Sequence, residues 1–212
     1  MIVVKIMLKR ERRKEERPGE IVKAAFEAFS ERGFAATRLE DVAALAGVTK
    51  GTIYVYFETK EKLFEAMVRH YSSRMLADAD AMLAAEQGSC TERLEAFLSF
   101  IYLRCARNRT GREIIRFIVT ESKSFPRLVE DNYRDFIAPT MLLVGELLAA
   151  GVANGDFRKN VTRETAEIVL APMVFLSILR LILDDGLKID EDAYVAAHID
   201  LALNGLLAPA SR

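Results

Sequence analysis

The sequence predicts an all-α fold in two parts, a small N-terminal group of three helices and a larger C-terminal helical bundle, with about nine helices in total. Apolar residues recur at helical spacing along most of the 212-residue chain, and no convincing strand pattern interrupts them. Glycine, asparagine or proline marks the ends of the segments. Because 51% of the residues are hydrophobic, a chain of this length can bury a core beyond the small N-terminal group.

The first predicted helix starts near Pro18, because proline suits the first turn of a helix. It ends at Gly33, where glycine stops a helix at little cost. Its inward face consists of apolar residues at helical spacing, namely Ile21, Ala25, Ala28 and Phe29. Residues 1–17 contain a long charged run, and we expect them to form a flexible basic arm.

The segment 37–60 predicts two short helices around a glycine turn. Thr37 and Glu40 have the spacing of a capping box, so a helix is expected to begin at Leu39. Gly47 can end this helix in the left-handed conformation, and Thr49 can cap the next one. The segment is therefore a candidate helix-turn-helix.

The outer face of the second short helix carries side chains that suit DNA. A helix N-terminus binds phosphate, Lys50 can contact a phosphate or a guanine, and Thr52 can contact a base edge or a thymine methyl group. Gly51 costs about 1 kcal/mol relative to alanine inside a helix, which favours a close backbone approach to a partner. The alternative is a structural helical hairpin with solvated hydroxyls. The predicted DNA-binding residues are Thr37, Arg38, Thr49, Lys50, Gly51, Thr52, Tyr54, Tyr56 and Lys60.

Residues 18–64 resemble the DNA-binding domain of the TetR (tetracycline-repressor) family of bacterial transcription regulators. The resemblance implies a homodimer whose last two helices pair with their copies in a twofold four-helix bundle. The rest of the chain shares the helical character and length of such regulators. The matching stretches are 21–29, 33–34, 42–43, 46–48, 50–54, 56–57 and 60–64, together with Thr37.

Charge is distributed unevenly along the chain, whose formal net charge is −1. Residues 1–72 hold 14 Lys and Arg against 11 Asp and Glu, which leaves 16 against 20 for the remainder. This favours DNA contact by the N-terminal part alone, although a chance imbalance of solvated charge fits the counts equally well. We divide the chain into the arm at 1–17, which either reaches DNA or serves as a solubilising tail, a helix-turn-helix domain at 18–64, and a ligand-binding and dimerisation domain at 65–212.

The C-terminal domain is expected to hold a ligand between its middle helices. Further helices are predicted at 59–86, 91–107, 111–122, 126–150 with a kink at Pro139, 162–185 and 190–207. Arg104 can orient an anionic or carbonyl ligand beside an apolar lining, or it can pair with Glu121 or extend to water. The alternative for each candidate is an ordinary core residue that contacts no ligand. The candidate pocket residues are Phe97, Phe100, Ile101, Arg104, Phe117, Tyr133, Phe136 and Met141.

The last two predicted helices carry more apolar surface than one core needs, which indicates a partner. We predict a homodimer, and the alternative is a fully internal helix of a monomer. The candidate interface residues are Met173, Phe175, Ile178, Leu179 and Ile182.

Catalysis, cofactors and membrane insertion find little support in the sequence. Two cysteines and two histidines show no metal-ligand, disulfide or nucleophile pattern, and no glycine-rich phosphate loop occurs. The apolar run 168–183 is interrupted by Pro172 and Arg180 and is short for a membrane span. We therefore expect a non-enzymatic regulator without a cofactor or metal, in the bacterial cytoplasm and nucleoid-associated when bound to DNA.

The expected partners are double-stranded operator DNA, a small-molecule effector and a second copy of the chain. The expected function is that of a repressor released from a palindromic operator by a small apolar or amphipathic effector. The competing class is an all-α enzyme, or a small-molecule or lipid carrier, whose N-terminal hairpin only resembles a DNA reader.

Overall fold

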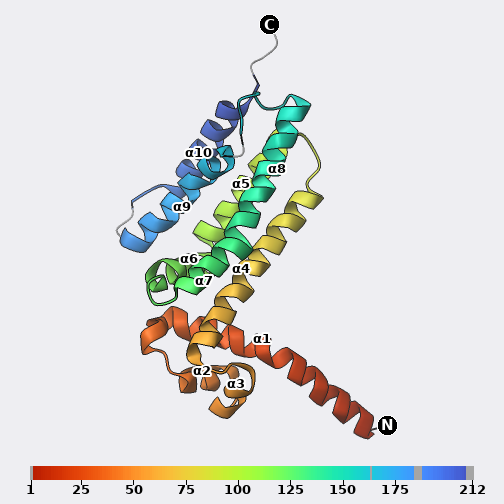
Figure 1. The fold of residues 1–212 in the computed structure, drawn as a ribbon, viewed down its shortest axis with the longest axis vertical. Helices are drawn as coiled ribbons and strands as arrows, with labels where there is room; N and C mark the ends of the chain where they lie inside the picture. The colour runs from red at the N-terminus through yellow and green to blue at the C-terminus, as the bar shows by residue number, and fades with distance from the viewer. Residues whose placement is uncertain (1, 163, 184–187, 209–212) are drawn as a thin grey trace. The chain divides into compact units, whose positions relative to one another are not determined.

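The computed structural model describes residues 2–162, 164–183 and 188–208, and no β-strand occurs among them. The described helices number nine if helices joined by π-helical turns are counted once, as the sequence predicts. They belong to two compact units, residues 1–71 and 72–212 (Figure 1).

The first unit contains α1 (Ile2–Ala36), α2 (Leu39–Ala46), α3 (Lys50–Tyr56) and the start of α4 (Lys60–Ala85). Its core is apolar and excludes solvent. The rings of Phe29 and Phe64 meet edge to face with centroids 5.3 Å apart. Residues that contribute fully buried side chains to this core are Ile21, Ala25, Phe29, Val42, Ile53, Leu63, Phe64, Met67 and Val68.

α1 is longer than the sequence analysis predicts. It begins at Ile2 instead of near Pro18, so residues 2–17 continue the helix where a flexible arm was expected. The run 8–17 explains the difference, since leucine, lysine, arginine and glutamate are all strong helix formers. The predicted glycine stop is confirmed: the backbone leaves helical geometry at Gly33 (φ 74°, ψ 168°), and the Phe34 ring packs 5.0 Å from that of Phe64.

The start of α2 at Leu39 is as predicted, but its cap differs. Thr37 is buried, and its hydroxyl faces the carbonyls of Gly33 (2.7 Å) and Ala28 (3.1 Å). The Asp41 carboxylate instead accepts from the Arg38 amide at 3.0 Å. The predicted capping box of Thr37 and Glu40 is therefore wrong, because the threonine side chain satisfies carbonyls at the end of α1 instead of amides of α2.

The second unit contains the rest of α4, then α5 (Cys90–Ile101), α6 (Arg109–Glu121), α7 (Pro126–Asn132), α8 (Ala138–Asn154), α9 (Thr165–Leu183) and α10 (Glu191–Leu206). In Figure 1, α5 and α8 run side by side through this bundle. The Tyr194 hydroxyl of α10 donates to the Pro172 carbonyl of α9 at 2.9 Å. Core side chains of the bundle include Leu94, Phe97, Leu98, Tyr102, Val144, Leu148, Phe157 and Leu176.

Two π-helical turns interrupt the bundle. η1 (Tyr102–Arg107) continues α5, and η2 (Tyr133–Ile137) joins α7 to α8. Near Pro139, where a kink was predicted, the structure has the π-helical turn η2. Proline has no amide hydrogen for an α-helical bond, and the amide of the preceding Ala138 donates to the carbonyl of Tyr133, five residues back. π-Helical turns widen a helix locally and occur often at functional sites.

Candidate DNA interface and ligand cavity

The turn between α2 and α3 has the geometry of a helix-turn-helix. Gly47 adopts the left-handed conformation (φ 63°, ψ 36°), and the Val48 amide donates to the Ala43 carbonyl at 3.0 Å. The Thr49 hydroxyl accepts from the Thr52 amide at 3.1 Å and so caps α3. Ile53 anchors α3 in the core. The predicted turn glycine and cap are both confirmed.

The outer side of α3 is exposed, as the DNA prediction requires. Thr49, Lys50 and Gly51 are exposed, and Tyr54 is 48% exposed. A Cβ atom added at Gly51 would meet only the Thr49 hydroxyl oxygen, at an ordinary 3.7 Å. The packing of the first unit therefore does not require glycine at this position, which fits the expected close approach to an external partner.

Lys50 is paired within the unit. Its Nζ lies 2.8 Å from the Glu40 carboxylate, and this hydrogen bond raises the pKa of Lys50 and lowers that of Glu40. Both side chains are exposed, so the pair contributes little to stability. To contact a DNA phosphate, Lys50 must therefore break its ion pair with Glu40.

Two predicted DNA contacts serve the unit itself. Lys60 Nζ donates to the carbonyls of Phe34 (2.9 Å) and Thr37 (3.0 Å) and lies 4.3 Å from the centroid of the Phe34 ring. Thr37 is only 1% exposed. Burial of the Thr37 side chain contradicts its assignment to DNA. The half-buried Lys60 satisfies carbonyls that the end of α1 leaves unpaired, a role that sequence spacing alone does not reveal, and its contact with DNA stays a prediction.

The other predicted contacts lie at or near the surface. Arg38 is exposed at the cap of α2, and it borders a surface hollow together with Lys50 and Tyr54. The Thr52 hydroxyl is half-buried, 2.9 Å from the hydroxyl of Thr49, and Tyr56 is half-buried at the end of α3. These residues form one continuous candidate surface for DNA.

The second unit contains an apolar cavity of about 230 Å³, which opens to the surface where Val119, Val174 and Ile178 are exposed. None of its seventeen lining residues is charged, and most of them are aliphatic. Six α-helices besides the two π-helical turns contribute to the wall. The lining residues are Met75, Ile101, Cys105, Gly111, Ile114, Ile115, Ile118, Val119, Asn132, Phe136, Ile137, Thr140, Met141, Leu170, Met173, Val174 and Ile178.

Only part of this lining is among the residues predicted from the sequence. Of the eight candidates, Ile101, Phe136 and Met141 border the cavity. Phe97 and Phe117 are fully buried core residues that do not line it. The other three candidates, Phe100, Arg104 and Tyr133, also lie outside the lining.

Arg104 does not provide the cavity with a charge. Its guanidinium forms an ion pair with Asp78 of α4 and lies 5.9 Å from the centroid of the Phe100 ring, which is half-buried. Tyr133 is 59% exposed. Helical spacing places all these residues correctly on helices, but it does not reveal which apolar face meets a gap and which meets a neighbouring helix.

Three polar side chains remain in the lining. Asn132 accepts a hydrogen bond at Oδ1 from the Ser72 hydroxyl (2.9 Å). Thr140 donates to the Phe136 carbonyl at 2.8 Å. Burial raises the pKa of the Cys105 thiol to about 12, so this thiol is neutral and a poor nucleophile. The cavity is therefore uncharged at neutral pH.

The wall between α6 and η1 is formed by close backbone contact. A Cβ atom at Gly111 would lie 1.9 Å from the carbonyl oxygen of Arg104, so only glycine fits there. Gly111 is not among the predicted pocket residues, because it stands at the start of the predicted helix 111–122, whereas the structure places it inside α6. Its neighbours Ile114, Ile115 and Ile118 were also missed, because an aliphatic run by itself indicates only burial.

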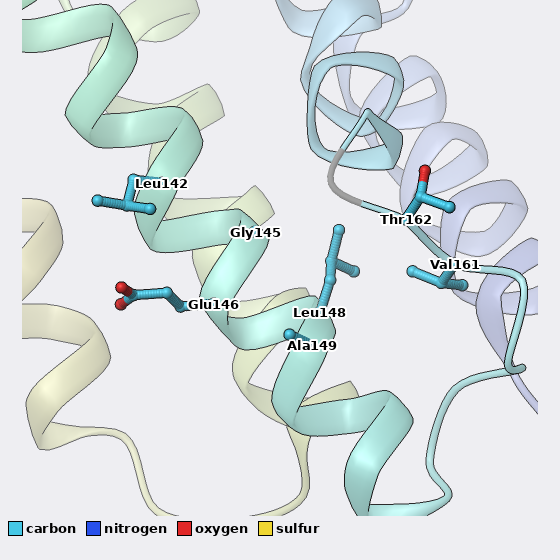
Figure 2. Close-up of a pocket in the computed structure, with 7 residues that line it drawn as sticks. All are labelled: Leu142, Gly145, Glu146, Leu148, Ala149, Val161 and Thr162. Carbon is cyan, nitrogen blue, oxygen red and sulfur yellow. The ribbon is translucent and has the colours of Figure 1, made fainter.

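A second hollow, on the surface of α8, lacks convergent polar groups. Figure 2 shows Leu142 and Glu146 on one side of α8, directed away from Val161 and Thr162 of the following loop. Its floor is formed by Gly145 and other small or apolar side chains. Since its carboxylate does not face the opposite wall, this hollow is a weaker candidate binding site than the apolar cavity.

α9 presents an apolar face to solvent. Ile168, Phe175 and Ile182 follow each other at seven-residue intervals and are 71%, 55% and 70% exposed. Of the predicted interface residues, Phe175, Ile178 and Ile182 lie on exposed surface, and Leu179 is half-buried. Met173 is 8% exposed and lines the cavity, so its assignment to an interface is wrong.

Comparisons with known proteins agree with this architecture. The family model described as bacterial regulatory proteins, tetR family, matches residues 21–67. The HTH-type transcriptional repressor NicS of Pseudomonas putida is 29% identical over 197 residues, which cover 88% of this chain and 90% of NicS. The HTH-type transcriptional regulator RutR of Escherichia coli strain K12 is 41% identical over 165 residues, which cover 78% of this chain and 66% of RutR.

A solved structure shares the fold. The transcriptional regulator FadR from Bacillus subtilis, crystallised in complex with stearoyl-CoA, matches with a TM-score of 0.72 at 18% identity, and the match covers 88% of this chain and 97% of FadR. Three findings lead to one assignment: the helix-turn-helix, the family model that matches it, and the relatives that match along most of the chain. The chain belongs to the TetR family and is a DNA-binding transcriptional regulator.

Proposed function

We propose that this regulator is a repressor that binds a palindromic operator as a homodimer and releases it when a small effector occupies the apolar cavity. The observation that carries the proposal is the course of α4. This helix begins at Lys60 in the first unit, and in the second unit it contributes Met75 to the cavity wall and Asp78 to the ion pair with Arg104. A ligand that moves the wall therefore acts on the helix that continues into the DNA-binding unit.

The exposed face of α9 supports the homodimer. Apolar side chains at seven-residue spacing suit helix-to-helix packing, and α10 adds Leu201, which is 72% exposed. A dimer also suits an operator with two half-sites, because each copy supplies one recognition helix. A single copy would hold only one half-site and bind correspondingly weakly.

The names of relatives support repression and ligand response. NicS is named a repressor, and FadR was crystallised with an acyl-CoA. For the present chain both properties belong to the proposal. The absence of charge among the residues that line the cavity favours an effector that is apolar where it is buried.

The N-terminal end of α1 supplies the positive charge of the first unit. Residues 1–15 hold six Lys and Arg against two Asp and Glu, whereas residues 16–71 hold eight against nine. We propose that this segment contributes phosphate contacts, since a basic helix end raises sequence-independent affinity for DNA.

The proposed function places the protein in the cytoplasm, nucleoid-associated while it holds DNA, without a membrane partner. Two described helical segments, Pro126–Asn154 and Thr165–Leu183, are long and apolar enough to cross a membrane by length and composition. Both also supply buried core residues, such as Val144 and Leu176. We assign the exposed apolar face of α9 to the second copy instead of to lipid.

Binding to the DNA upstream of its own gene, measured by fluorescence anisotropy against a scrambled duplex, tests the proposal. We expect a preference for one palindromic segment and two chains per bound duplex by sedimentation. Equal affinity for both duplexes would contradict operator binding and favour the enzyme or carrier alternative. A monomer at micromolar concentration would contradict the homodimer.

A further inference from the structure

The lining of the cavity excludes a charged ligand group. No lysine, arginine, aspartate, glutamate or histidine borders it, and the one ionisable side chain, Cys105, is held neutral by burial. An ion that enters such a cavity loses its hydration without gaining an opposite charge, which costs several kcal/mol. The part of a ligand that enters is therefore neutral.

The volume of the cavity limits the size of the ligand. A cavity of about 150 Å³ admits benzene, so 230 Å³ has room for roughly nine non-hydrogen atoms by proportion. The wall at Gly111 is backbone against backbone, and it cannot recede without displacement of η1. A single ring with a short substituent fits this space, whereas a long acyl chain does not.

One side chain of the lining offers hydrogen-bond donors. Asn132 uses Oδ1 to accept from the Ser72 hydroxyl, which directs the Nδ2 group to the other side of the amide. The two N–H groups of Nδ2 have no hydrogen-bond acceptor among the described residues. The Thr140 hydroxyl already donates its proton to the Phe136 carbonyl. Asn132 is therefore the residue of this mostly apolar lining that has N–H groups to offer a ligand.

We propose that the cavity binds a compact neutral molecule, a single ring with one carbonyl or similar oxygen acceptor, and that Asn132 Nδ2 donates to this oxygen. The inference rests on the proposed effector role of the cavity and specifies its chemistry. Asn132 is a specificity residue in this account, because it discriminates between ligands of equal shape that differ in one oxygen atom.

Isothermal titration calorimetry on the full chain tests the proposal with four probes: acetophenone, ethylbenzene, benzoate and stearate. Acetophenone carries a ketone oxygen, ethylbenzene has a similar shape without it, benzoate is charged, and stearate is a long-chain anion. We expect acetophenone to bind roughly two- to tenfold more tightly than ethylbenzene, the range of a single net hydrogen bond. We expect no saturable binding of benzoate or stearate.

Variants assign the effect to the cavity and to one atom. Asn132→Leu should remove the preference for acetophenone while ethylbenzene still binds. Ser72→Ala removes the bond that orients the amide and should reduce the preference for acetophenone while both probes still bind. Ile118→Trp should fill the cavity and abolish binding of both probes, whereas Leu142→Trp, in the separate hollow on α8, should not. Thermal unfolding of each variant confirms that it folds.

Two results would overturn the proposal in different ways. Binding of benzoate or stearate that Ile118→Trp abolishes, together with release of operator DNA, would contradict the ligand class but leave the effector role of the cavity intact. If the chain holds its operator but no probe binds to it and no probe releases the DNA, the ligand class and the effector role of the cavity would both be contradicted. An acetophenone preference that survives Asn132→Leu would contradict the role of the amide.

Discussion

Asp78 of α4 and Arg104 of η1 form an ion pair that connects the helix shared by the two units to the wall of the cavity. Asp78 lies one turn along α4 from Met75, which itself lines the cavity, and Arg104 precedes the lining residue Cys105. Ligand contact and ion pair thus involve the same two elements. We expect a change in the position of η1 to act on α4 at this point.

Asp78→Asn is expected to weaken the response to ligand more than it weakens the fold. The two side chains are 40% and 33% exposed, so loss of the pair should cost at most about 1 kcal/mol of stability. Operator affinity without ligand should stay nearly constant, while acetophenone should release DNA less effectively. Anisotropy titrations with and without acetophenone measure the change. The reversed pair, Asp78→Arg with Arg104→Asp, should restore part of the response, and no recovery would contradict an electrostatic link.

Lys60 and Lys50 are expected to behave oppositely on substitution. Lys60→Met should lower the free energy of unfolding by about 1–3 kcal/mol, because carbonyls of Phe34 and Thr37 lose a charged donor. Lys50→Met should leave stability nearly unchanged and lower the magnitude of the salt slope of DNA binding by about one unit. Urea unfolding and anisotropy at several salt concentrations separate the two effects. A reduced salt slope with full stability in Lys60→Met would show that Lys60 contacts phosphate instead.

Phe175→Glu is expected to shift the protein from dimer to monomer. The substitution would bury a carboxylate in the proposed interface twice per dimer, which is unfavourable without a partner charge. Sedimentation velocity measures the shift, and operator affinity should fall with it. Leu142→Glu, on exposed surface of α8, is the control. A monomeric wild-type protein, or a Phe175→Glu dimer of unchanged affinity, would contradict the assignment of this face.

The stability of the second unit is expected to fall as the pH falls below about 6.5. His198 is buried, its Nδ1 lies 2.8 Å from the Tyr102 hydroxyl, and burial lowers its pKa. Above the unfolded-state pKa near 6.5 the imidazole is neutral in both states, so its contribution to the free energy of unfolding is fully present. Below that value the unfolded chain binds a proton that the folded chain does not, so stability is lost as the pH falls towards the folded pKa.

Thermal unfolding between pH 7.5 and 5.5, compared with His198→Gln, measures this contribution. The variant keeps a polar side chain opposite Tyr102 but does not titrate, so its melting temperature should depend less steeply on pH. Carboxylates titrate alike in both proteins and cancel in the comparison. Parallel pH profiles would contradict a neutral, buried imidazole.

The sequence was sufficient for the architecture and the helix-turn-helix because local signals determine them. Gly47, Thr49 and the apolar spacing of α2 and α3 act within a few residues, and each took the predicted conformation. The roles of Thr37 and Lys60 were not predictable from spacing, since their partners lie at the end of α1, up to 26 residues away in sequence. Local patterns carry no information on such contacts.

The cavity was predictable only in outline for a related reason. An apolar residue on a helix indicates burial, but whether it borders a gap depends on how several helices pack together. Met173 illustrates the limit, because the same periodicity suited an interface, yet the residue faces the cavity. Gly111 was the more specific signal, since a glycine inside a helix marks a close backbone contact.

The central claim is that a ligand in the cavity and operator DNA each weaken the binding of the other to the same chain. Measurement of both affinities in one thermodynamic cycle tests this claim most directly. Operator affinity is measured with and without saturating acetophenone, and acetophenone affinity with and without saturating operator. Linkage requires the two ratios to be equal, and a typical coupling of about 1–3 kcal/mol corresponds to roughly 5- to 150-fold. We predict equal ratios in this range for the wild-type chain and a ratio of one for Ile118→Trp. A wild-type ratio of one, with both ligands bound at once, would contradict the account.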